Sequence, residues 1–141
     1  IGEPQSGAPW EFKMQNLFIG KGNLASSPEL KHLTGGRDGT FTVAKMRVMF
    51  GRYGANQAGE IEQTGGFWRE VEIYGAKAEA CARHLRKGAR VLVIGEEREF
   101  MATDEHGNEV QVMKVVADDV ALQLSRIESI TFTPSKVYEP A

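Results

Sequence analysis

Residues 66–95 read GFWREVEIYGAKAEACARHLRKGARVLVIG, and this stretch decides the fold. Its first part, residues 67–74, alternates between two sets of side chains, as a β-strand does. One face carries Phe67, Arg69, Val71 and Ile73, and the other carries Trp68, Glu70, Glu72 and Tyr74. Val71 and Ile73 suit a hydrophobic core. We therefore expect Trp68 and Tyr74 to lie outside that core, with the two glutamates, on a solvent-facing side of the sheet.

The rest of this stretch predicts a short helix and a second strand. Apolar side chains recur at helical spacing within residues 76–87 and form one stripe: Ala78, Cys81, Ala82 and Leu85. Gly88 is well placed to follow the helix, since glycine readily adopts the left-handed conformation found there. Residues 89–101 then read as a long strand.

Most of the remaining chain also predicts strands. Residues 14–24 suggest a strand bent at its glycines, and residues 29–33 suggest a short extended piece. Residues 40–50 alternate, which places Ala44, Met46, Val48 and Phe50 on one face. Residues 51–66 hold five glycines and few apolar side chains, so we expect a long, mobile loop there. A turn at residues 104–108 leads into a returning strand at 110–116, and residues 117–124 finish the domain.

This order of elements predicts an all-β OB-fold. The prediction is a five-stranded, partly open barrel with one α-helix between strands three and four and a long hairpin of strands four and five. We divide the chain into an N-terminal extension (1–13), the OB-fold domain (14–124) and a short C-terminal tail (125–141).

Composition limits the function only broadly. The chain has 141 residues, which suits one domain with a single core. Its formal net charge of −2 gives no support to nucleic-acid binding, so a binder would need to concentrate positive charge locally. No apolar run is long enough to span a bilayer, and no signal peptide is visible. The single cysteine, Cys81, suits a reducing compartment, and we expect a cytoplasmic protein.

Catalysis and cofactor binding have little support in the sequence. His32, His84 and His106 are far apart, and no cysteine pair or His-x-x-x-His spacing predicts a zinc site. The glycine-rich segment precedes a strand rather than a helix, so it does not predict a phosphate-binding loop. We expect no enzyme activity, no metal and no cofactor.

The aromatic side chains of residues 67–74 suggest a binding role instead. Large aromatic rings on a wetted sheet face are what a stacking surface for unpaired bases requires. The same rings could equally pack against another subunit, since aromatic residues are enriched in protein interfaces. The residues alone leave both readings open for Trp68 and Tyr74.

Short segments in a specific order and spacing run from about residue 14 to residue 124. They are Gly22-Asn23-Leu24 with Pro28-Glu29, residues 43–48, Phe67-Trp68-Arg69 with Ile73-Tyr74-Gly75, Lys77-Ala78-Glu79, Leu85-Arg86-Lys87-Gly88, Val91, Val93 and Gly95, and Val115-Val116-Ala117-Asp118. No single segment is decisive, but their order and spacing are. By these segments the chain resembles the DNA-binding domain of the bacterial single-stranded DNA-binding protein family.

The resemblance implies binding of single-stranded DNA without sequence preference, by base stacking and phosphate pairing. Trp68, Tyr74 and Tyr53 match the family's stacking positions. Phe100 could replace an aromatic residue that the family has near position 102, although it could also be a core residue or a clasp between subunits. The cations implied beside the rings are Lys45, Arg47 and Arg52, with Lys21, Arg37 and Arg98 as weaker candidates. A homo-oligomer is expected, with a tetramer as the family norm and a dimer as the alternative.

Several residues depart from the family pattern. Glu70 and Glu72 stand where the family has a basic and an apolar residue, and we expect them to weaken phosphate attraction. Arg69 replaces a histidine that lies near a subunit contact. Residues 125–141 do not resemble the family's acidic tail tip, which recruits other DNA-processing proteins, so we do not expect these residues to recruit them. These departures motivate two further hypotheses: a member encoded on a mobile element, and an OB-fold protein-interaction or primosome-type module with weak DNA affinity.

Overall fold

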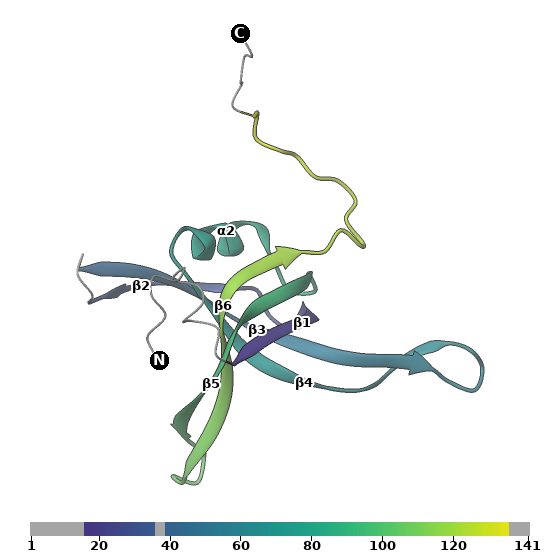
Figure 1. The fold of residues 1–141 in the computed structure, drawn as a ribbon, viewed down its shortest axis with the longest axis horizontal. Helices are drawn as coiled ribbons and strands as arrows, with labels where there is room; N and C mark the ends of the chain where they lie inside the picture. The colour runs from purple at the N-terminus through teal and green to yellow at the C-terminus, as the bar shows by residue number, and fades with distance from the viewer. Residues whose placement is uncertain (1–15, 36–38, 136–141) are drawn as a thin grey trace, which may run out of the picture.

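The computed structural model describes residues 16–35 and 39–135. In chain order the elements are β1 (Leu17–Leu24), β2 (Glu29–Thr34), β3 (Thr40–Ala55), β4 (Ile61–Tyr74), α2 (Ala76–His84), β5 (Arg90–Thr103) and β6 (Glu109–Leu122). Figure 1 shows two hairpins that extend away from a common body: β3–β4 points to the right of the view, and β5–β6 points downward.

Five of the strands close into a ring. Neighbours around it are β1, β5, β6, β4 and β3, and β3 returns to β1 through the pairs Asn23–Met49 and Leu24–Val48. The β4–β6 pair is parallel, whereas the other pairs in the ring are antiparallel. The helix lies between the third and fourth strands of this ring. The predicted OB-fold is confirmed, and β2 extends the sheet by pairing with β3 at its outer edge.

The alternation read from the sequence explains the core. Val71 and Ile73 of β4 are fully buried beside the β3 residues Ala44, Met46 and Val48. The rings of Phe18, Phe50 and Phe67 pack together at one part of this core, with centroids 5.0–6.4 Å apart. Three apolar side chains on or beside α2 complete it: Ala78, Cys81 and Leu85.

The predicted loop at residues 51–66 is wrong. These residues continue β3 and β4 as a long two-stranded ribbon, with a short turn at residues 56–60. Gly51 pairs with Gly66 and Arg52 with Gly65, so four of the five glycines lie within paired strands and only Gly59 lies in the turn. The ribbon is held by backbone hydrogen bonds and needs no buried face, which is why its composition resembled that of a loop. A register shift between Arg52 and Tyr53 marks a bulge in it.

Smaller differences concern the ends of elements. The helix ends at His84 rather than at residue 87, because Leu85 has already turned to an extended conformation. Residues 110–116 and 117–124 were predicted as separate pieces, but β6 runs unbroken from Glu109 to Leu122. The bulge that permits this lies in the β5–β6 pairing, at Ile94 and Gly95.

Two absences hold for the part of the chain that the structure describes. No group of three or more histidine, cysteine, aspartate or glutamate side chains is arranged to hold a metal ion. No helix is long and apolar enough to cross a membrane.

Candidate nucleic-acid interface

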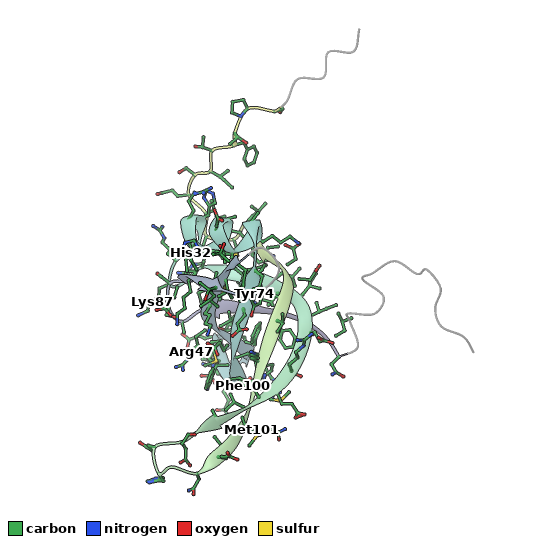
Figure 2. The ribbon with its side chains drawn as sticks, turned by 90° about the vertical axis from the view of Figure 1, so that its left-hand side faces the viewer. His32, Arg47, Tyr74, Lys87, Phe100 and Met101 are labelled. Atoms are coloured by element: carbon green, nitrogen blue, oxygen red, sulfur yellow. The ribbon has the colours of Figure 1, made fainter. Side chains whose placement is uncertain are left out.

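A band of side chains crosses four neighbouring strands of the ring and faces away from the core. Cross-strand pairing places Lys45 of β3 beside Glu72 of β4, Glu70 of β4 beside Lys114 of β6, and Lys114 beside Arg98 of β5. We call this band the outer strip. Its members are Lys45, Arg47, Trp68, Glu70, Glu72, Tyr74, Arg98, Phe100, Val112 and Lys114. Figure 2 shows Tyr74, Arg47 and Phe100 following one another from the body of the protein toward the β5–β6 hairpin.

Trp68 presents an exposed ring near the centre of the outer strip. The residue is 43% exposed, as is Tyr74, which is unusual for so large an aromatic residue. The Arg47 guanidinium lies 4.2 Å from the centroid of the Trp68 ring, a cation–π distance. The sequence therefore places a cation and a flat ring in contact, with both still open to solvent.

Glu72 differs from the sequence expectation. It was predicted to face solvent with Glu70, but it is only 4% exposed. Its carboxylate accepts a hydrogen bond from the Tyr74 hydroxyl at 3.2 Å and pairs with the Lys114 ammonium at 3.2 Å and the Lys45 ammonium at 3.8 Å. The three side chains cover Glu72, and two of them neutralise it. Glu72 is therefore a paired, buried charge within the outer strip.

A shallow hollow of about 450 Å³ lies at one side of the outer strip. Arg47 and Trp68 form part of its wall, and Ser26 and Ser27 reach it from the segment between β1 and β2. The other lining residues are Glu29, Lys45, Met46, Glu70 and Val112. The hollow is open, and its lining combines charged side chains with Trp68, Met46 and Val112, so it suits an extended ligand with polar and apolar parts better than a small apolar one.

Two more predicted rings lie on the outer strip. Tyr74 is exposed, and its ring centroid is 5.9 Å from that of Phe41. Partial burial, and then the neighbouring Glu72 carboxylate, raise the pKa of the Tyr74 phenol, against a smaller opposing effect of Arg98. Phe100 is half-buried, and the Lys114 ammonium lies 4.9 Å from its ring centroid. The structure thus brings Trp68, Tyr74 and Phe100 to one face with Lys45 and Arg47.

The other predicted residues lie outside the outer strip or are already paired with another side chain. Arg52 and the exposed Tyr53 are farther out on the β3–β4 hairpin, and Lys21 is exposed on β1. Arg98 is on the outer strip but forms an ion pair with Glu96 at 2.6 Å. Arg37 lies outside the described residues.

Lys114 is the charged member of the outer strip that the sequence did not predict. Its ammonium reaches Glu72, on a strand distant in sequence, because β4 and β6 pair in parallel. One signal was available: Val112, Lys114 and Val116 alternate with the more buried Val115 and Ala117. That pattern places Lys114 on the outward face, but it does not reveal which strand lies beside it.

Comparison with known proteins identifies the family of this chain. The model of the Single-strand binding protein family matches residues 14–123. A single-stranded DNA-binding protein of Xylella fastidiosa is 31% identical over 108 residues, which are 76% of this chain and 62% of that protein. One from Mycolicibacterium smegmatis is 31% identical over 104 residues, which are 73% of this chain and 61% of that protein. The chain thus spans less than two thirds of the length of either relative.

Two solved structures share the fold at lower identity. A small single-stranded DNA-binding protein from Streptomyces coelicolor gives a TM-score of 0.65 at 17% identity, covering 78% of this chain and 95% of that one. The Plasmodium falciparum SSB, solved in complex with ssDNA, gives 0.60 at 20% identity, covering 79% and 97%. With the family match over most of the chain, these findings show that the protein belongs to the single-strand binding protein family.

Proposed function

We propose that this chain binds single-stranded DNA along the outer strip without reading its sequence. The observation that carries the proposal is the exposed Trp68 ring under the Arg47 guanidinium, at the edge of an open hollow. A base could stack on the ring while a phosphate meets the cation. Family membership supports the same role, since the two curated relatives carry the name single-stranded DNA-binding protein.

The composition of the outer strip fits binding without sequence preference. Every base has a flat face, so stacking on Trp68, Tyr74 and Phe100 would favour no sequence, and each stacked base adds about 1–3 kcal/mol. Arg47 would pair with phosphates, and Arg52 and Tyr53 would extend the contact along the β3–β4 hairpin. The outer strip offers rings and cations rather than a nucleophile with a base beside it, so we propose a protein that coats unpaired strands and does not alter them.

We assign this binding to residues 14–124 and treat residues 125–141 as a tail. A protein that protects unpaired strands during replication, recombination, repair or DNA transfer would act beside the nucleoid in the bacterial cytoplasm.

Tryptophan fluorescence tests the proposal directly. The chain has two tryptophans, so Trp10→Phe leaves Trp68 as the single reporter. Titration of that variant with oligo(dT) should quench Trp68, and affinity should fall steeply as salt is added, because phosphate pairing releases counterions. Absence of quenching at low salt contradicts the proposal and favours the protein-interaction module. Double-stranded DNA of equal length serves as the control and should quench far less.

We also propose that the chain forms a homo-oligomer through β1. Leu17 and Ile19 point away from the core, and Ile19 is 60% exposed. On the edge of β1 opposite β5, residues 17–22 pair with no strand in the described part of the chain. An open edge beside apolar side chains favours pairing with a second copy. We expect the wild-type protein in solution to have at least twice the 15.5 kDa mass of one chain. Ile19→Lys should lower that mass. A wild-type protein with the mass of a monomer contradicts the proposal.

A further inference from the structure

We infer that Glu72 is an internal counter-charge that positions the binding groups of the outer strip and limits how many phosphates they can hold. The inference rests on the proposed function and goes beyond it, because it assigns a role to a buried acidic residue in the middle of a surface for an anionic ligand. Such a residue is unexpected there, since a carboxylate repels phosphate.

The positioning role follows from three contacts. The Glu72 carboxylate holds the Tyr74 hydroxyl and the Lys114 ammonium, each at 3.2 Å. The same ammonium lies 4.9 Å from the Phe100 ring centroid. One carboxylate therefore holds the Tyr74 side chain on β4 directly and reaches the Phe100 ring on β5 through Lys114 of β6. Figure 2 labels both residues, with Phe100 nearer to the β5–β6 hairpin than Tyr74.

The charge-limiting role follows from burial. The Glu72 side chain is 5% exposed, whereas those of Lys45 and Lys114 are 34% and 24% exposed. A buried carboxylate without partners is costly, so Glu72 retains its lysines unless another group compensates it. Glu72, Lys45 and Lys114 then present a ligand with a net charge of only one positive unit. A phosphate that approaches either lysine must compete with Glu72 for its ammonium group.

Glu70 provides a natural comparison on the same strand and face. It lies two residues before Glu72 and is half-buried, and no ion pair of Glu70 is found among residues 16–35 and 39–135. Removing its charge changes the net charge of the outer strip by the same amount as removing that of Glu72. It does not release a bound lysine. A difference in DNA binding between Glu70→Gln and Glu72→Gln therefore measures the effect of the ion pairs of Glu72 with Lys45 and Lys114.

The test is the salt dependence of oligo(dT) binding by the full-length chain. For Glu72→Gln, log K should fall more steeply with log salt, by about 0.7 for each lysine that gains a phosphate and about 1.4 for both. The larger value corresponds to roughly a sevenfold greater loss of affinity for a fourfold rise in salt. Glu70→Gln should change the slope by less than half as much. Equal slopes for the two glutamine variants, or a Glu72→Gln slope equal to that of wild type, overturn the charge-limiting role.

Glu72→Val tests positioning. If Glu72→Gln does not fold, the salt slope of Glu72→Val takes its place in the comparison with wild type and Glu70→Gln. Valine frees both lysines but leaves the Tyr74 hydroxyl without its acceptor. The slope should be as steep as for Glu72→Gln, while affinity at low salt should be several-fold lower. Equal affinity of the two variants contradicts the positioning role.

A measurement without DNA separates this inference from the proposed function. In Glu72→Gln the pKa of the Tyr74 phenol should fall toward its ordinary value, because the neighbouring negative charge is gone. Ultraviolet titration against Tyr74→Phe reads this directly. An unchanged pKa overturns the inference itself. A lowered pKa in a protein that does not bind oligo(dT) instead contradicts the proposed function.

Discussion

Trp68→Ala should lower the affinity for oligo(dT) by roughly 5- to 150-fold, which corresponds to about 1–3 kcal/mol for a lost stacked base. The effect should exceed that of any other single ring, because Trp68 presents the largest aromatic surface of the outer strip and holds Arg47 against its face. Without the indole, Arg47 also loses the partner that orients its guanidinium. Fluorescence anisotropy of labelled oligo(dT) measures the loss without depending on a tryptophan signal.

Trp68→Phe is the matched control, since it keeps a smaller ring in the same place. Its affinity should lie between those of wild type and Trp68→Ala. The solution mass of each variant should equal that of wild type. If affinity is unchanged in Trp68→Ala while the oligomer dissociates, the ring belongs to a subunit interface and the stacking role is wrong.

Gly95→Ala should destabilise the fold by about 3 kcal/mol or more, because a side chain here meets backbone that cannot move away. A β-carbon at Gly95 would contact the Val116 carbonyl oxygen and lie 2.6 Å from the Ala117 α-carbon. Both atoms belong to β6, which passes close to β5 at the bulge beside Ile94. The midpoint of urea unfolding measures the loss.

Gly107→Ala is the control for Gly95→Ala, because it adds the cost of an unfavourable backbone conformation without any steric clash. Gly107 lies in the turn between β5 and β6 with φ of 84°, and a β-carbon there would meet nothing within 4 Å. Gly107→Ala should lower the free energy of unfolding by about 1–2 kcal/mol, the cost of holding alanine in the left-handed conformation. Gly95→Ala unfolding at the wild-type urea midpoint contradicts the close approach of β5 and β6.

The sequence was most informative where a strand has one buried face. The alternation of residues 44–50 and 67–74 identified the core side chains of β3 and β4 correctly, and it placed Trp68 and Tyr74 outside the core. It failed for the β3–β4 hairpin beyond Phe50, because a ribbon with neither face buried leaves no hydrophobic period. Its paired glycines, such as Gly51 and Gly66, carry no side chain and so add nothing to the pattern.

The surroundings of Glu72 could not be read from one sequence for a different reason. The alternation put Glu72 on the outward face, which is correct, but outward does not mean exposed. Its burial comes from Lys45, Lys114 and Tyr74, and Lys114 reaches it only through the non-local pairing of β4 and β6. A pattern within one strand predicts which way a residue points; the neighbouring strands decide what covers it.

Photocrosslinking of the wild-type chain to oligo(dT) tests the central claim most directly, because it reports which residues touch the bases. After tryptic digestion, Trp68 and Tyr53 fall in peptide 53–69, Tyr74 in 70–77 and Phe100 in 99–114. We predict crosslinks in these three peptides, with fragmentation locating that of 53–69 mainly at Trp68, and loss of that signal in Trp68→Ala. Crosslinks confined to the rest of the chain would show that DNA binds away from the outer strip and would contradict the account.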